Sequence, residues 1–199
     1  MFSTLVDQPN LYRVNNKSFI SHKILEQFGF RQKASVHFLI RNPEQRLQSF
    51  FHNKFRQHIE KSNFSDWEHC QRIFFDHLEI EKSDAPKLIK EKILNFSYSQ
   101  FIQTLSDHYL KDAHLIPQSK MTSLSIMGIV LPIKNKPDEV YIMEEEKDII
   151  KLEQTFDLNL SHKINVSHKD FEEFSVSKEL EQTVRKIYKE DYKMYSNWS

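Results

Sequence analysis

The segment VHFLIRNPEQRLQS carries residue types with which a protein can bind a phosphate group. Its β-branched and aromatic start, residues 36–40, predicts a buried strand, and Asn42 and Pro43 suit the cap and the first position of a helix. The first N–H groups of a helix lack intrahelical partners and its dipole is positive there, so an anion is stabilised at this end. Arg41 follows the strand with a planar guanidinium suited to phosphate, and Ser49 can add a hydroxyl.

Surface salt bridges are the alternative role for the two arginines of this segment. Arg41 and Arg46 could pair with the carboxylates of Glu44 or Asp66 and leave no charge for a ligand. The residue types alone leave both interpretations open.

The spacing Arg-Asn-Pro-x-x-Arg-x-x-Ser closely resembles a motif of the carbohydrate sulfotransferases and their bacterial relatives, which use 3′-phosphoadenosine-5′-phosphosulfate (PAPS). The resemblance implies that Arg41 and Ser49 bind the 3′-phosphate of the nucleotide, and that Arg46 is structural. It also implies a helix-rich α/β fold of the P-loop-NTPase-like, three-layer kind, with a short central parallel sheet flanked by helices. Residues 1–199 would form a single sulfotransferase-like domain.

Five further segments resemble family motifs in the same order along the chain. The closing segment YKEDYKMY, for example, resembles the pattern Y-x-x-D-Y-x-x-F, and DAHLIPQ resembles H-W-x-P-Q. The segments are residues 96–110, 112–118, 141–148 (with Glu144 and Asp148 at the acidic positions), 162–167 and 188–195.

A loop for the 5′-phosphosulfate is expected within VNNKSFISH, where Lys17, Ser18 and Ser21 would contact this group. Lys17 would stabilise the charge that builds on the bridging oxygen during sulfuryl transfer. Phe19 and Ile20 stand where relatives have small residues, and bulky residues make it harder for the backbone to wrap a phosphate. An exposed lysine beside a helix cap is the alternative interpretation of Lys17.

A histidine is the best candidate for the base that accepts a proton from the acceptor hydroxyl, because it titrates near neutrality. His114 is the first choice, since it lies in a predicted loop and at a family position, and His22 is the second. A structural role is the alternative for His114. His37, on the predicted strand, is expected to be a core histidine.

Hydrophobic periodicity predicts the elements that position these residues. Helices and strands alternate, which indicates a parallel α/β sheet. The expected strands are residues 11–14, 36–40, 126–131 and 140–143; the expected helices are residues 17–28, one from Asn42 onward, two around the turn at 83–86, 96–110 with Ser97 as cap, 144–156 and 177–195.

Composition excludes several classes of protein. The 28 basic and 28 acidic side chains balance, which disfavours a uniformly basic nucleic-acid surface. With Gly29 and Gly128 as the only glycines, an ordinary ATPase loop is excluded. Cys70 is the single cysteine, so no internal disulfide or multi-cysteine zinc site is possible, and no metal is expected. Without a signal peptide or a long apolar run, the protein is expected to be cytoplasmic with no membrane span.

Three functions remain open from the sequence. The leading hypothesis is a PAPS-dependent sulfotransferase that acts on a hydroxyl of a carbohydrate or small molecule and releases adenosine 3′,5′-bisphosphate. The second is a non-catalytic relative that binds the nucleotide, which the unusual residues after Lys17 favour. The third is a P-loop-like kinase that uses ATP and magnesium.

Overall fold

The computed structural model describes residues 37–57, 59–122, 124–126, 129–131, 138–158 and 174–198. Several expectations lie outside these ranges: the strand at 11–14, the helix at 17–28, the segment at 162–167, and with them Lys17, Ser18, Ser21 and His22.

The chain divides into two compact units, each built from separate stretches of sequence. The described part of the first unit comprises residues 37–40, those between 118 and 158, and Trp198. The second comprises residues 41–57, 59–117 and 174–197. That residues 1–199 form a single domain stays a prediction.

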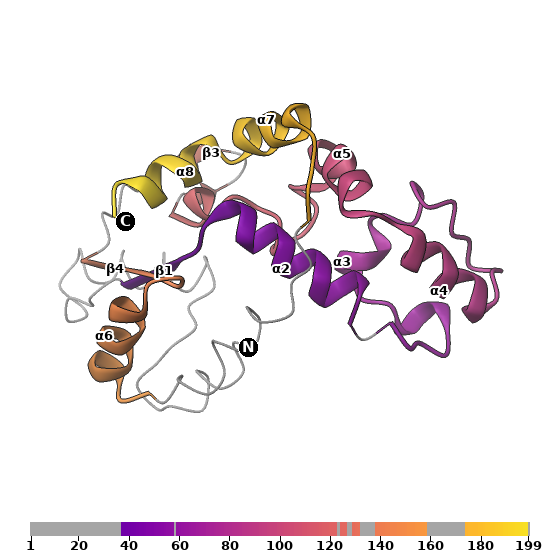
Figure 1. The fold of residues 1–199 in the computed structure, drawn as a ribbon, viewed down its shortest axis with the longest axis horizontal. Helices are drawn as coiled ribbons and strands as arrows, with labels where there is room; N and C mark the ends of the chain where they lie inside the picture. The colour runs from indigo at the N-terminus through magenta and orange to yellow at the C-terminus, as the bar shows by residue number, and fades with distance from the viewer. Residues whose placement is uncertain are drawn as a thin grey trace. The chain divides into compact units, whose positions relative to one another are not determined.

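A parallel pair of strands forms the centre of the first unit. Strand β1 (His37–Ile40) pairs with β4 (Glu139–Ile142), and the N–H of Met143 extends the ladder by donating to the Ile40 carbonyl over 2.9 Å. Helix α6 (Glu146–Phe156) packs against β4, and Figure 1 shows it beside the two strands. The parallel pairing and the helix confirm an α/β arrangement in which the sheet is small and helices dominate.

A second, antiparallel pair corrects the prediction of one strand at residues 126–131. Strand β2 (Leu124–Ile126) pairs with β3 (Ile129–Leu131), so the polypeptide reverses where a continuous strand was expected. A 3₁₀-helix, Gln118–Thr122, precedes this hairpin.

Helix α2 (Pro43–Phe55) opens the second unit as the sequence predicts. Asn42 is its N-cap and Pro43 its first residue. The side-chain oxygen of Asn42 accepts hydrogen bonds from the N–H groups of Glu44 and Gln45, at 3.0 and 3.3 Å. The predicted apolar stripe is confirmed, since its four members are all buried: Leu47, Phe50, Phe51 and Phe55.

The remaining helices of this unit agree with the sequence in part. Ser97 caps α5 (Tyr98–His108) and α4 (Pro86–Asn95) begins directly after the expected turn. The helix expected before that turn is reduced to α3 (His69–Arg72), which follows a 3₁₀-helix, Phe64–Asp66.

The predicted single helix at 177–195 is wrong, because it breaks into α7 (Lys178–Ile187) and α8 (Lys189–Ser196). The break falls at Tyr188, whose backbone leaves the helical region at φ −102° and ψ 24°. The Tyr188 side chain is buried, and its hydroxyl donates to the Leu115 carbonyl over 2.6 Å.

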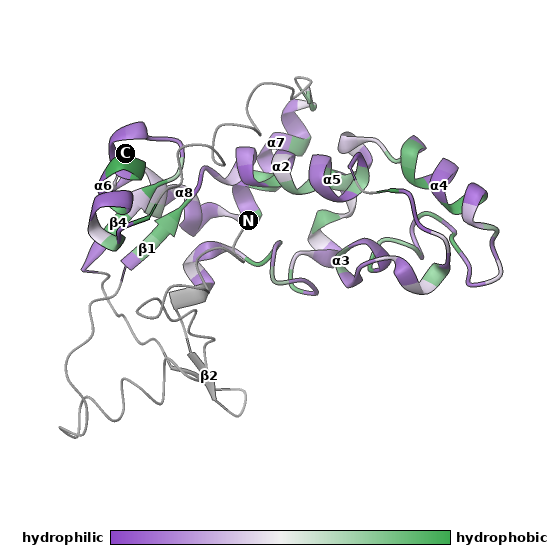
Figure 2. Ribbon diagram, turned by 90° about the horizontal axis from the view of Figure 1, so that it is seen from below, coloured by the Kyte–Doolittle hydropathy of each residue, from purple (hydrophilic) through white to green (hydrophobic). Residues whose placement is uncertain are grey.

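Phenylalanine rings form the core of the second unit. Phe51, Phe55 and Phe101 are fully buried, and the ring centroids of Phe51 lie 5.4 Å from those of the other two. Aromatic pairs at such distances add stabilisation to the burial of their apolar surface. Figure 2 shows hydrophobic and hydrophilic residues alternating along α4, as expected for a helix with one face on this core.

We predict that replacing the α2 cap will destabilise the protein measurably. Asn42→Ala removes the acceptor of two first-turn N–H groups, and it should lower the free energy of unfolding by about 1 kcal/mol. Asn42→Asp keeps an acceptor and adds negative charge at the positive end of the helix, so it should have a much smaller effect. Urea unfolding followed by circular dichroism measures both variants, and equal losses would contradict the capping role.

Candidate functional site

The first turn of α2 is the candidate anion site, and its backbone N–H groups already have partners within the protein. Asn42 takes two of them through its side chain, and the N–H of Arg46 donates to the Asn42 carbonyl over 2.9 Å. Pro43 has no N–H to offer. The expectation of unpaired amides at this helix end is therefore wrong, and an anion here would be held by side chains.

Arg41 and Arg46 stand on either side of the first residues of α2. Burial lowers the pKa of the Arg46 guanidinium, whereas Tyr188 and the carboxylate of Asp191 raise it, and the positive charge of Arg41 has a smaller lowering effect. The charge of Arg46 is therefore used within the protein, and Arg41 is the arginine of this segment that the resemblance assigns to a ligand.

Arg46 ties three separate segments of the second unit together. Its Nη2 donates to the carbonyls of His114 and Ile116, at 2.6 and 2.7 Å. Its Nη1 lies 3.7 Å from Oδ2 of Asp191 on α8, whose carboxylate is fully buried. The structural role expected for Arg46 is confirmed, and the alternative of a surface pair with Glu44 or Asp66 is wrong for this arginine.

Glu44, in the first turn of α2, is instead held by helices α7 and α8. The Tyr192 hydroxyl donates to Oε1 of Glu44 over 2.7 Å, and Arg185 lies 3.5 Å from the same oxygen. Burial raises the pKa of Tyr192, and the hydrogen bond to Glu44 raises it further.

The loop that contains His114 is fixed at three consecutive carbonyls. Arg46 binds those of residues 114 and 116, and Tyr188 binds that of Leu115. Leu115 itself is fully buried. The backbone at His114 is therefore anchored, whereas its imidazole faces solvent. The His114 side chain is 62% exposed.

A carboxylate orients this exposed imidazole. Nδ1 of His114 lies 2.8 Å from Oδ1 of Asp112, and the backbone N–H of His114 donates to the same oxygen over 2.9 Å. The Asp112 side chain is only 9% exposed, so the carboxylate lies beneath the histidine. The ring centroid of His114 is also 6.1 Å from that of Phe50 on α2.

The structure places three of the residues predicted for the site in one unit, and none of the contacts described here joins their side chains. Arg41, Ser49 and His114 belong to the same unit; Arg41 and Ser49 are both partly buried. Lys17, Ser18 and Ser21 lie outside the described residues, so their contact with the 5′-phosphosulfate stays a prediction.

Sequence reasoning missed four side chains that build the site, although the signals were present. One is Asp112, which belongs to the DAHLIPQ segment. The other three occupy the first three defined positions of the closing motif Y-x-x-D-Y-x-x-F, and each contacts α2 or the His114 loop: Tyr188, Asp191 and Tyr192.

In the first unit the acidic motif residues have local roles. Asp148 accepts the N–H of Ile142 over 2.8 Å, which joins the start of α6 to the end of β4. The N-cap of α6 is Glu145, so this helix begins two residues after the expected start at residue 144. His37 is only half-buried, so the expected core position is not observed, but its ring packs 4.9 Å from that of Phe156 and its Nδ1 lies 3.2 Å from the Tyr141 hydroxyl.

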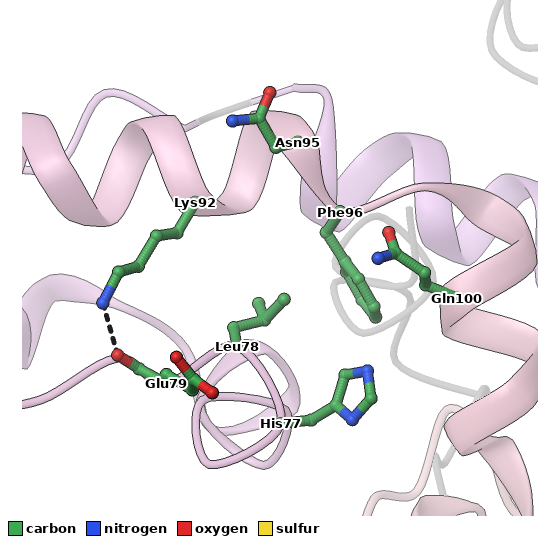
Figure 3. Close-up of a pocket in the computed structure, with 7 residues that line it drawn as sticks. All are labelled: His77, Leu78, Glu79, Lys92, Asn95, Phe96 and Gln100. Carbon is green, nitrogen blue, oxygen red and sulfur yellow. Dashed lines mark hydrogen bonds between the residues drawn. The ribbon is translucent and has the colours of Figure 1, made fainter.

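A surface pocket of about 270 Å³ lies elsewhere in the second unit, between α4, the start of α5 and the turn at residues 77–79 after α3. Two of its polar side chains already bind other parts of the protein: Lys92 donates to the Glu79 carbonyl, as Figure 3 shows, and Gln100 accepts the N–H of Ser97. None of the residues predicted for the site lines this pocket.

No protein-family model, curated protein or solved structure matches the chain. Within the described ranges, no group of three His, Cys, Asp or Glu side chains is placed to hold a metal ion. None of the helices described here combines the length and apolar character needed to cross a bilayer.

We predict that Arg46 is required for stability and that its surface counterpart is not. Arg46→Met leaves the buried Asp191 carboxylate without its cation and two carbonyls without a donor, so it should lower the free energy of unfolding by about 3 kcal/mol. Arg185→Met removes an exposed ion pair with Glu44 and should cost less than about 1 kcal/mol. Urea unfolding of both variants measures the difference, and similar losses would contradict the structural role of Arg46.

Proposed function

We propose that this protein is a PAPS-dependent sulfotransferase with a P-loop-like fold. It would transfer a sulfuryl group to a hydroxyl of a carbohydrate or small molecule and release adenosine 3′,5′-bisphosphate. The observation that carries the proposal is the convergence of three motif segments on one side chain. Arg46 comes from the Arg-Asn-Pro motif, and it contacts His114 of the second motif and Asp191 of the closing motif.

This convergence matters because each motif is weak when considered alone. Segments as far apart in sequence as Arg46 and Asp191 have no local reason to meet. Chance similarity would scatter the matching residues over the unit, whereas here they share hydrogen bonds and an ion pair.

The chemistry requires positioning and charge stabilisation rather than a metal or redox group. Arg41 and Ser49 would bind the 3′-phosphate, since a planar guanidinium and a hydroxyl both donate hydrogen bonds to phosphate oxygens. Lys17, with Ser18 and Ser21, would bind the 5′-phosphosulfate. The acceptor oxygen would attack sulfur in line while the bond from sulfur to the bridging oxygen breaks.

A nucleotide-binding module without transferase activity is the second candidate. It is favoured by the bulky Phe19 and Ile20 after Lys17, which make it harder for the backbone to wrap the 5′-phosphosulfate. Titration calorimetry with adenosine 3′,5′-bisphosphate, followed by a turnover assay with ³⁵S-labelled PAPS, separates the two. Binding without turnover across many acceptors favours the module, and tighter binding of ATP with magnesium would favour a kinase.

We predict that Arg41 is the main determinant of nucleotide affinity. Arg41→Ala should weaken the binding of adenosine 3′,5′-bisphosphate by about 2–4 kcal/mol, because the phosphate loses a charged partner. Arg72→Ala, at an exposed arginine of α3 in the same unit, serves as the control and should leave affinity unchanged. Calorimetry measures both, and wild-type affinity in Arg41→Ala would refute the assignment.

Lys17 should act on the transition state more than on binding. Lys17→Ala is expected to lower kcat by about 100-fold, since one donor to the developing charge is lost. The affinity for adenosine 3′,5′-bisphosphate should change far less, because that product lacks the sulfuryl group. Steady-state kinetics and calorimetry on the same sample test this, and equal losses in both would limit Lys17 to ground-state binding.

A further inference from the structure

We propose that Asp112 is the positioning residue of the reaction, fixing His114 in the tautomer whose Nε2 accepts the proton of the acceptor hydroxyl. This inference rests on the proposed function, and it adds a residue that no motif assigned to the chemistry. Its basis is the pair of contacts at one carboxylate oxygen, to Nδ1 and to the backbone N–H of His114.

The tautomer follows from the chemistry of the two partners. An ionised carboxylate only accepts hydrogen bonds, so Nδ1 of a neutral His114 must carry the proton that it donates to Asp112. The lone pair is then left on Nε2, at the other side of the ring. With the His114 side chain 62% exposed, that nitrogen is open to an incoming hydroxyl, while the carboxylate behind it is shielded from water.

Hydrogen bonds of the surrounding turn hold Asp112 and His114 in place. The N–H groups of Leu115 and Ile116 donate to the Asp112 carbonyl, at 3.0 and 3.1 Å, and close a turn around the histidine. Arg46 and Tyr188 bind the three carbonyls that follow within the same turn. A base must be held within a fraction of an ångström of its productive position, and an anchored turn meets this requirement better than a free loop.

The turn that carries the pair is bound to α2. The backbone carbonyl of His114 accepts a hydrogen bond from Arg46 over 2.6 Å, and the ring centroid of His114 lies 6.1 Å from that of Phe50 on the same helix. The proposed ligands of the 3′-phosphate, Arg41 and Ser49, directly precede the Asn42 cap of this helix and lie on it, respectively.

The step balances in atoms and charge. The acceptor oxygen forms a bond to sulfur, and the bond from sulfur to the 5′-phosphate oxygen breaks, which leaves adenosine 3′,5′-bisphosphate. The hydroxyl proton moves to Nε2 of His114, the resulting imidazolium is stabilised by Asp112, and the proton then passes to water. The other titratable or charged groups that face this turn come from α2, α3, α8 and the residue between α7 and α8: Arg46, His69, Cys70, Asp191 and Tyr188.

The test uses the full chain with ³⁵S-labelled PAPS and a panel of 4-nitrophenyl glycosides as acceptor probes. His114→Ala should lower kcat by about 100-fold, and added imidazole should restore part of the activity, which loss of a merely structural side chain would not allow. Asp112→Asn keeps an acceptor for the turn but removes the charge, so kcat should fall by about 10-fold with little change in KM. Lys111→Ala, at an exposed neighbour in the same loop, is the control and should retain activity.

A second measurement does not depend on activity. ¹⁵N spectra of histidine-labelled protein, with the His114 signals assigned by their loss in His114→Ala, should show a protonated Nδ1 and an unprotonated Nε2 at high pH. The reverse tautomer in the wild type overturns the proposal, as does full activity in Asp112→Asn or His114→Ala.

The outcomes separate this inference from the proposed function. If adenosine 3′,5′-bisphosphate does not bind the wild type, the proposed function fails and the inference fails with it. If the nucleotide binds and sulfuryl transfer occurs, but Asp112→Asn or His114→Ala keeps full activity or the spectra show the reverse tautomer, only the inference fails. Binding with no transfer to any glycoside of the panel overturns the role of His114 as a base.

Discussion

The buried guanidinium of Arg46 is the interaction on which the arrangement of the second unit depends. Burying a cation costs free energy that only well-placed partners offset. Arg46 has two carbonyls on one side of its planar group and the Asp191 carboxylate on the other. Because the guanidinium is rigid and planar, these partners fix the direction of the 112–117 loop and of α8 relative to α2 within this unit.

Tyr188 also helps to hold the 112–117 loop. Its buried hydroxyl binds the Leu115 carbonyl between the two that Arg46 binds, so three consecutive carbonyls have donors from two distant segments. The helix break at Tyr188 separates α7 from α8 and accompanies the placement of Asp191 against Arg46. The closing motif is therefore best understood as an anchor for the loop rather than as a source of catalytic groups.

Local signals explain what could be predicted from the sequence. The β1 strand, the Asn42 cap, the apolar stripe of α2 and the Ser97 cap of α5 all depend on neighbouring residues, and each is confirmed. The break at Tyr188 could not be predicted, because apolar spacing continues through it and the partner of the Tyr188 hydroxyl, Leu115, lies far away in the sequence. Similarly, no residue near Arg46 in the sequence indicates that Asp191 is its partner.

Asp112 is a different case, because its contact with His114 is local. In turns, an aspartate side chain commonly accepts a hydrogen bond from the backbone N–H two residues later. The spacing of Asp112 and His114 was therefore compatible with a purely structural role for the aspartate. What distinguishes this pair is the second contact, from the imidazole, and the burial of the carboxylate beneath an exposed ring. Both depend on the fold around the loop and therefore required the structure.

The cap of α2 limits how this helix end could bind an anion. Asn42 satisfies the first-turn amides, so the helix end contributes its dipole but no free N–H groups. Asp191 offsets the charge of Arg46, and Glu44 is held by Tyr192 and Arg185. Under the proposed function, the 3′-phosphate would therefore be bound by side chains, with Arg41 as its charged partner, because the backbone amides are already used in the fold of the helix.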